Sequence, residues 1–201
     1  RRPVLDVLMK GLKRLEYRGY DSAGVAYFDK NEIKVQKKEG KLANVEPLLK
    51  GISVSGLQCG MGHTRWATHG KPTTQNAHPH RTGHVVLVHN GIIENYLEIK
   101  DDLKKKGYEP ASETDSELFG FLVFDKMKTG KNLVESVREC FKLLHGFCSV
   151  VVMSDQEPGK FVAVRNGTPL VAAIDPEGGA FLASDAQALL EYTKDMFFLE
   201  D

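Results

Sequence analysis

The chain has 201 residues, and its 27 lysines and arginines balance 27 aspartates and glutamates, so the formal charge is zero. Because there is no net positive field, the sequence does not favour nucleic acid or an anionic membrane as the main partner. No apolar stretch approaches the ~20 residues that cross a bilayer, and the N-terminus lacks the apolar region of a signal peptide. We therefore expect one cytoplasmic domain over residues 1–201, with a core drawn from the 41% of residues that are hydrophobic.

Hydrophobic periodicity predicts the elements of the N-terminal half. Apolar residues at three- and four-residue steps indicate an amphipathic first helix that ends near Gly19. Apolar runs then indicate a strand pair, a short helix, and two further strands separated by a long loop, and loops of that length are usually functional. The expected bounds are helix 4–15, strands 22–28 and 32–38, helix 41–50, two strands within 57–93 and the loop 68–83.

The C-terminal half is expected to hold three helices followed by short strands that Gly and Pro interrupt. Thr114 or Asp115 is placed to cap the second of these helices. Because strands lie at both ends of the chain with helices before and between them, the fold class is α+β, with packed sheets flanked by helices. The expected bounds are helices 94–106, 114–128 and 132–145, short strands from 148 to 174 and on to 199, and a helix around 186–192.

Six of the seven histidines fall between residues 63 and 89, which raises the question of a metal site. Metal ligands converge from rigid elements, whereas His78 and His80 alternate in a loop that contains proline. We therefore predict structural or ligand-lining roles for these side chains, and neither a metal nor another cofactor.

Cys59 lies close to His63 and His69 in the sequence, a combination that suggests a thiol nucleophile. If residues 58–64 form a strand, however, Cys59 alternates with Gly60 and Gly62 and is a small core residue. Because free cysteine is among the most buried residue types, we favour the core interpretation.

Three further positions have ordinary structural interpretations that the residues alone leave open. Asn90-Gly91 is the commonest type of two-residue hairpin turn, and on local sequence we favour a turn there. Arg65 is placed to form an ion pair at a strand end, and Asp115 to cap a helix.

Several short segments, taken together and in order, resemble the glutaminase domain of the glutamine–fructose-6-phosphate aminotransferases, which are class II glutamine amidotransferases. Five such segments in sequence are far more specific than any one of them. Tyr17, Tyr20 and the run Trp66-Ala67-Thr68-His69 resemble the hexosamine branch rather than the related purine and asparagine enzymes. The five segments are Leu15 to Gly24, His63 to Gly70, Asn76 to His80, His89 to Asn95 and Ser112 to Glu117.

The resemblance implies a fold and a nucleophile. The fold is a four-layer αββα sandwich with two antiparallel sheets, in the N-terminal nucleophile hydrolase group. The nucleophile of that family is a cysteine that begins the mature enzyme in a Cys-Gly-Ile-Val-Gly segment, which we expect upstream of Arg1. The chain is then either part of an active enzyme or a glutamine-binding or structural module without a nucleophile, and both alternatives stay open.

The resemblance also implies an activity, partners and site residues. Glutamine would be hydrolysed to glutamate and ammonia, and a sugar-phosphate isomerase domain of the same homodimeric enzyme would use the ammonia to aminate fructose 6-phosphate. Free glutamine carries both an α-carboxylate and an α-ammonium, so its recognition needs a cation and an anion at fixed positions. The implied roles are Asn90 and Gly91 for the oxyanion, Arg18 near the nucleophile, Arg65 for the carboxylate, Asp115 for the ammonium, and Trp66, Thr68 and His69 for the wall around the ligand.

Overall fold

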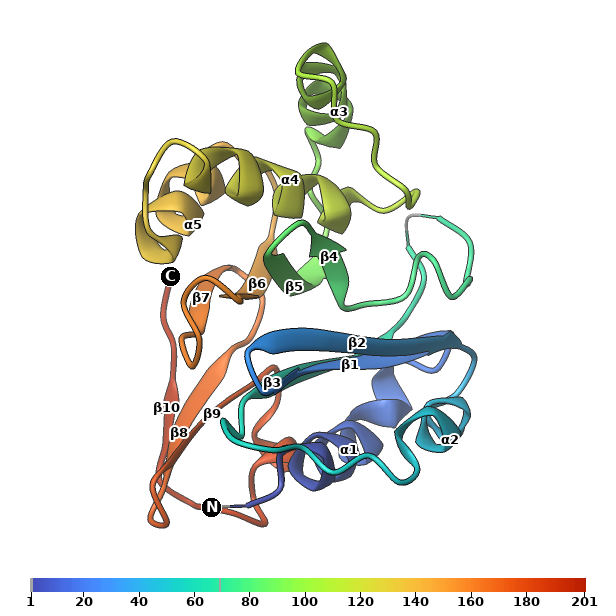
Figure 1. Cartoon of the computed structure of the whole chain (residues 1–201), viewed down its shortest axis with the longest axis vertical. Coiled ribbons are helices and arrows are strands. Elements are labelled where there is room, and N and C mark those ends of the chain that lie inside the picture. The colour runs from blue at the N-terminus through green and yellow to red at the C-terminus, as the bar shows by residue number, and fades with distance from the viewer. Residues whose placement is uncertain (1, 69) are drawn as a thin grey trace.

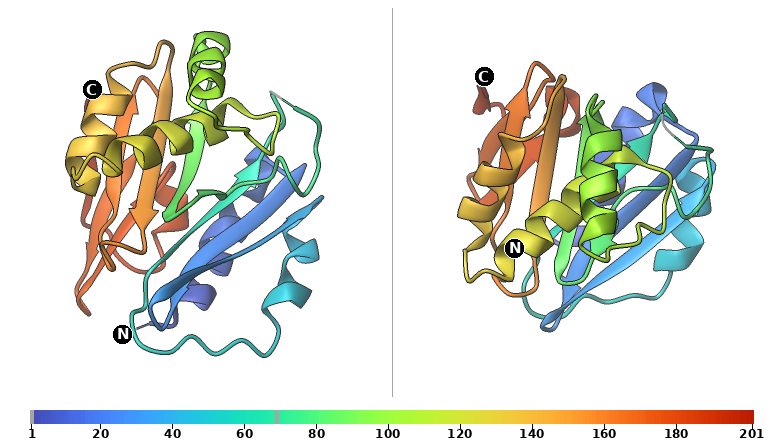
Figure 2. Two further views of the ribbon diagram at one scale, coloured as in Figure 1. Left: turned by 45° about the horizontal axis from the view of Figure 1, so that its top comes forward. Right: turned by 90° about the horizontal axis from the view of Figure 1, so that it is seen from above.

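Four layers, in the order helix, sheet, sheet, helix, make up most of the fold (Figures 1 and 2). The structure is a computed structural model that describes residues 2–68 and 70–201. All strand pairs in it are antiparallel. The expected α+β sandwich is therefore confirmed.

The first sheet has the strand order β2-β1-β3. Its central strand is buried along almost its whole length, because helix α1 packs below it and the second sheet packs above it. A turn with Lys30 at φ +58° joins β1 to β2, the two strands that the sequence predicts in this region. The elements of this half are α1 (Val4–Leu15), η1 (Glu16–Arg18), β1 (Ser22–Asp29), β2 (Glu32–Glu39), η2 (Leu42–Asn44), α2 (Glu46–Leu49) and β3 (Gly60–Arg65).

The second sheet has the strand order β4-β5-β6-β7, and helices α4 and α5 cover its outer face (Figure 1). Within residues 2–68 and 70–201, no helix combines the length and the apolar character that crossing a membrane requires. The elements are β4 (His80–Thr82), β5 (Val85–Gly91), α3 (Tyr96–Lys105), α4 (Asp115–Met127), α5 (Leu133–Phe141), β6 (Cys148–Ser154) and β7 (Val162–Asn166).

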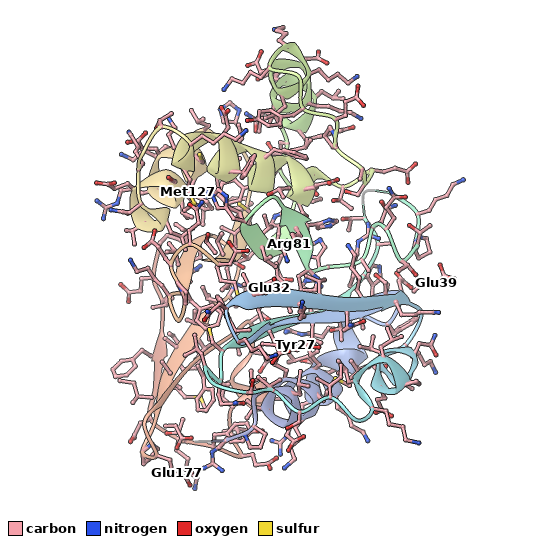
Figure 3. The ribbon with its side chains drawn as sticks, in the orientation of Figure 1. Tyr27, Glu32, Glu39, Arg81, Met127 and Glu177 are labelled. Carbon is pink, nitrogen blue, oxygen red and sulfur yellow. The ribbon has the colours of Figure 1, made fainter. Side chains whose placement is uncertain are left out.

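Three apolar cores separate the four layers. One lies between α1 and the first sheet, a second lies between the two sheets, and the third and largest lies between the second sheet and its helices. Arg81 strengthens the middle contact, because its guanidinium donates to the Ile33 carbonyl of β2 at 2.5 Å and to Asp155 at 3.1 Å. Figure 3 shows Arg81 between β4 and β2, and side chains filling the space between the layers.

A third, three-stranded sheet stands beside the sandwich, with the order β10-β8-β9, and the two-sheet expectation did not include it. Its strand β9 and strand β3 of the first sheet are both outermost in their sheets among the described residues. They face each other across a cavity and do not pair. The elements are β8 (Val171–Asp175), β9 (Gly179–Ala183), η3 (Ala186–Ala188) and β10 (Met196–Phe198).

The long loop and two short elements differ from the sequence expectations. The loop expected over 68–83 is shorter, because residues 80–82 form β4 and Gly83 at φ +60° turns the chain directly into β5. The helix expected over 41–50 is divided into η2 and α2, where Pro47 lies in the first turn of the second piece. The helix expected at 186–192 is only the single turn η3.

Helix α5 also ends earlier than the expected residue 145, because tertiary hydrogen bonds replace helical ones. The Asn95 side chain donates to the Leu143 carbonyl at 2.9 Å and accepts from the His145 N–H at 3.0 Å. These bonds draw residues 143–145 away from the helix axis and toward the start of α3. Hydrophobic periodicity alone does not reveal that the Asn95 side chain competes for these backbone groups.

Candidate functional site

A cavity of about 1180 Å³ lies between β3, the third sheet and the end of β5. Seven of the eight residues predicted for the site line it, and they come from segments far apart in the sequence. The eighth, His69, lies outside the described residues. The seven are Arg18, Arg65, Trp66, Thr68, Asn90, Gly91 and Asp115.

Arg65 supplies the positive charge of the cavity. It is the last residue of β3 and only 5% exposed, and its guanidinium donates to the Gly70 and Lys71 carbonyls, both at 3.3 Å. Burial lowers the pKa of this guanidinium from its ordinary value, and the nearby Asp115 carboxylate opposes that effect. The position therefore holds a buried cation that also anchors the start of the loop after β3.

Asp115 supplies the negative charge. It lies in the first turn of α4 and is 5% exposed, and its Oδ2 accepts the Ile93 N–H at 2.8 Å. The helix cap is Thr114, whose hydroxyl accepts the Glu117 N–H at 3.4 Å, so the capping role considered for Asp115 is wrong. Because the helix N-terminus carries a partial positive charge, a carboxylate is favourable there even when buried.

Asn90 and Gly91 form the end of β5, where they pair with Ser149 and Cys148 of β6. The hairpin turn that local sequence favours is therefore wrong, because a neighbouring strand continues the ladder through this pair. Gly91 has φ +118°, and a Cβ on it would lie 2.1 Å from the Phe147 carbonyl oxygen. The position thus accepts glycine alone, which leaves its backbone open toward the cavity.

The mouth of the cavity carries Arg18 and an aromatic pair. The Arg18 guanidinium donates to the Ser184 hydroxyl at 2.7 Å and lies 3.8 Å from Asp185. Trp66 is 58% exposed and packs edge to face against Tyr20, with ring centroids 5.6 Å apart. Arg18 therefore links η1 to the residues that directly follow β9.

Four histidines pack together at the cavity, from β3, β4, β5 and the loop before β4, and three of them, His63, His78 and His89, line it. The His78 ring lies 4.4 Å from the His63 ring and 4.6 Å from the His80 ring, between centroids. His80 Nε2 lies 3.0 Å from the Thr114 hydroxyl, and His89 Nδ1 lies 2.8 Å from the Ser116 hydroxyl. Within residues 2–68 and 70–201, no three His, Cys, Asp or Glu side chains are grouped to hold a metal ion.

Burial keeps three of these rings, His63, His78 and His80, neutral. It lowers the pKa of His63 to about 4 and lowers the pKa values of His78 and His80 well below the usual range. These three rings are thus uncharged hydrogen-bonding groups inside the fold at neutral pH.

Cys59 lies in the core between the two sheets, as the strand alternation predicts. Burial raises the pKa values of Cys59, Cys140 and Cys148 to about 11. Thiols are nucleophilic as thiolates, so none of these three is suited to attack an amide near neutral pH.

The predictions missed the contact that His63 makes with the site. His63 Nε2 lies 2.8 Å from Asn90 Oδ1. Its position was readable from the sequence, because alternate residues of a strand face the same side and His63 precedes Arg65 by two. The Ser184 contact with Arg18 has no comparable local signal, since 166 positions separate the two residues.

Two solved structures share this fold. One is an allosteric regulatory enzyme of purine biosynthesis, with a TM-score of 0.80 and 23% identity. The other is a glutamine phosphoribosylpyrophosphate amidotransferase from B. subtilis, with a TM-score of 0.78 and 20% identity. Each alignment covers 98% of this chain and 44% of the other. The fold is therefore that of an amidotransferase with paired antiparallel sheets.

Sequence comparison then identifies the family. The family profile described as a glutamine amidotransferase domain matches residues 63–191, more than half of the chain, and the chain belongs to this family. It is 45% identical over 200 residues to the glutamine–fructose-6-phosphate aminotransferase (isomerizing) of Acinetobacter baylyi, and 46% identical over 202 residues to that of Thermus thermophilus. Both alignments cover all of this chain but only 32% and 33% of the relatives, so the chain spans about a third of their length.

The neutral histidines make the stability of the domain sensitive to acid. Unfolded histidine has a pKa near 6.5, so below that value the unfolded chain binds more protons than the folded one, and the free energy of unfolding falls. The effect is up to ~1.4 kcal/mol per pH unit for each such histidine. We expect urea unfolding between pH 7 and pH 5 to show this slope, and His80→Gln to flatten it. An equal slope in the wild-type protein and in His80→Gln would contradict the assignment.

Gly91 and Gly130 form a matched pair for testing the close packing at the end of β5. Both have positive φ, +118° and +87°, but a Cβ on Gly130 meets nothing within 4 Å. We expect Gly130→Ala to cost about 1–2 kcal/mol of unfolding free energy through backbone strain alone. Gly91→Ala should cost a further ~1–3 kcal/mol through the steric clash. Denaturant titration measures the difference, and equal costs would show that the close contact is relieved by movement.

Proposed function

We propose that this chain is the glutaminase domain of a cytoplasmic, homodimeric glutamine–fructose-6-phosphate aminotransferase. It hydrolyses L-glutamine to glutamate and ammonia, and a sugar-phosphate isomerase domain of the same enzyme uses the ammonia to form glucosamine 6-phosphate from fructose 6-phosphate. The names of the relatives and their threefold greater length support this assignment. The observation that carries it is one cavity lined by a buried cation, Arg65, a buried anion, Asp115, and the residues Asn90-Gly91 at the end of β5.

Glutamine recognition follows from the two charges. Arg65 binds the α-carboxylate with a planar fork of N–H donors, and Asp115 accepts from the α-ammonium. Both side chains are 5% exposed and line the same cavity, so water competes weakly for either charge. Trp66, Thr68 and His69 belong to the wall around the bound amino acid in this proposal, and Arg18 lies near the nucleophile.

Asn90 and Gly91 receive the oxygen of the side-chain amide. When a nucleophile attacks the amide carbon, this oxygen becomes negative and needs donors that are already in place. The Asn90 carboxamide and the Gly91 N–H are such donors, and the Gly91 backbone is accessible because no side chain covers it. The same pair also continues the β5–β6 ladder, which holds it rigid.

The nucleophile in this proposal is a cysteine upstream of Arg1, in an extended segment that lies along the groove between β3 and β9. Both strands present an outermost edge to the cavity, and Arg2 itself lines it. The buried Thr168 and Tyr192 hydroxyls also line this cavity and have no hydrogen-bond partner among the described residues. An added strand would meet backbone partners along these edges, a mode of recognition common in proteins.

The reaction balances with glutamine and one water. The cysteine sulfur bonds to the amide carbon while its own α-amine takes the thiol proton, and Asn90 and Gly91 hold the oxyanion. The C–N bond then breaks, and the α-ammonium of the cysteine returns the proton to the leaving nitrogen. Ammonia departs and leaves a thioester between the cysteine sulfur and the glutamyl carbon. Water adds to the thioester carbon, the C–S bond breaks, and glutamate and the free thiol result.

A glutamine-binding or structural module without a nucleophile is the alternative function. If the natural protein has no cysteine upstream of Arg1, the raised pKa values of Cys59, Cys140 and Cys148 favour this alternative. Such a module would keep Arg65 and Asp115 for binding and would hydrolyse nothing.

Two substitutions in the full-length protein separate chemistry from binding. We expect Asn90→Ala to lower kcat for glutamine hydrolysis by roughly 10²–10³ while the KM changes little. Asp115→Ala should instead weaken glutamine binding and raise KM, because it removes the partner of the α-ammonium. Steady-state glutaminase assays measure both, and unchanged kinetics in the two variants would reject the assigned roles.

The N-terminus of the natural protein distinguishes the enzyme from the module. We expect intact-mass analysis and N-terminal sequencing to find a mature chain that begins with Cys-Gly. Replacement of that cysteine by alanine should abolish glutaminase activity and still allow glutamate to bind beside Arg65 and Asp115. A natural chain without that cysteine would support the module instead.

A further inference from the structure

Asn90 is held by a side chain from the opposite sheet. His63 lies in β3 of the first sheet and Asn90 in β5 of the second, and His63 Nε2 is 2.8 Å from Asn90 Oδ1. Both residues line the cavity. We propose that His63 is a positioning residue, which donates from Nε2 to Asn90 Oδ1 and so turns the NH₂ end of the Asn90 carboxamide toward the reacting amide. The inference rests on the proposed function. It adds to that function the group that decides which end of the Asn90 carboxamide faces the oxyanion.

The need for such a group follows from the shape of a carboxamide. Its oxygen and its NH₂ are nearly equal in size, so packing alone does not decide which end faces the cavity. Only the NH₂ end stabilises a developing oxyanion, and the oxygen end would repel it. An N–H donor placed against Oδ1 removes the flipped arrangement, because the flipped NH₂ would then face another donor.

The surroundings of His63 favour one state of the ring. A neutral imidazole has one donor nitrogen and one acceptor nitrogen. Nε2 of His63 lies 2.8 Å from Asn90 Oδ1, and because an amide oxygen only accepts hydrogen bonds, this contact requires the proton to be on Nε2. Burial holds the ring neutral at pH 7, since the pKa is about 4.

The neighbouring rings hold His63 in place and have hydrogen-bond partners of their own. His78 packs against it at 40° between ring planes, and its Nδ1 accepts the His89 N–H at 3.3 Å. His80 bonds to Thr114, whose hydroxyl caps the helix that carries Asp115. The cluster thus connects the residue that faces Asn90 with the start of α4.

Two carboxamide variants of the full-length enzyme test where the donor must be. In His63→Gln the side-chain NH₂ reaches about as far as Nε2 of the ring, whereas in His63→Asn it reaches only about as far as Nδ1. Both are neutral and polar, so they perturb burial in a similar way. We expect His63→Asn to lower kcat for glutamine hydrolysis about 10- to 100-fold with KM changed less than about threefold, and His63→Gln to recover most of the loss.

A double-variant cycle shows whether His63 acts through Asn90. In an Asn90→Ala background, His63→Asn should cause no further loss of kcat, because the group it positions is gone. If His63 had a purely structural role, the losses of kcat from His63→Asn and Asn90→Ala would be independent and would multiply. Both carboxamide variants of His63 would then also lower the thermal stability to a similar extent. The exposed His145→Asn serves as the control and should leave kcat unchanged.

The outcomes separate the two proposals. If the wild-type enzyme hydrolyses glutamine and Asn90→Ala impairs it, the proposed function stands, and a wild-type kcat in His63→Asn then overturns the positioning role alone. Multiplying losses in the double variant also overturn it.

If the wild-type enzyme with its N-terminal cysteine does not hydrolyse glutamine, the proposed function itself fails. Histidine ¹⁵N shifts then decide the donor separately, and a proton on Nδ1 of His63 overturns the inference.

Discussion

Apolar side chains packed between the two sheets hold β3 and β5 against each other, and the site depends on that packing. Phe28 of β1, Met61 of β3, Val86 of β5 and Met153 of β6 all belong to this buried layer. Interdigitation of this kind fixes the separation of packed sheets at about 10 Å. The polar residues that follow along β3 and β5 are therefore brought face to face, close enough for one hydrogen bond to join the two sheets.

The cavity holds opposite charges that water would otherwise stabilise. Burying a guanidinium or a carboxylate is costly unless hydrogen bonds replace the lost water. Backbone carbonyls bond to Arg65, and a backbone N–H together with the start of α4 compensates Asp115. Because these partners belong to the fold, both charges are in position before a ligand arrives, and a zwitterion of matching span needs little rearrangement to bind.

The regular elements were predictable wherever periodicity and local chemistry agree. Helix α1, the β1–β2 hairpin and α4 lie close to their expected bounds, because apolar spacing, turn residues and a capping threonine all point the same way. The other predictions failed because distant segments of the chain supply hydrogen-bond partners that local sequence does not reveal. The strand character of Asn90-Gly91 depends on pairing with β6, and the early end of α5 depends on Asn95.

The grouping of the site residues around one cavity was predictable for a different reason. Residues such as Arg65 and Asp115 were assigned through resemblance of whole segments, since each had an ordinary interpretation on its own. The structure brings together the residues so assigned, except His69, which lies outside the described part. The contact between His63 and Asn90 needed coordinates, because 27 positions separate the two residues and no local pattern relates them.

Trp66 is the only tryptophan in the chain, and it lies half-exposed at the rim of the cavity beside Tyr20. Its indole fluorescence therefore originates at a single place in this domain. An amino acid that enters the cavity would shield this ring from solvent, so the emission spectrum becomes a label-free optical signal for occupancy that requires neither turnover nor chemical modification.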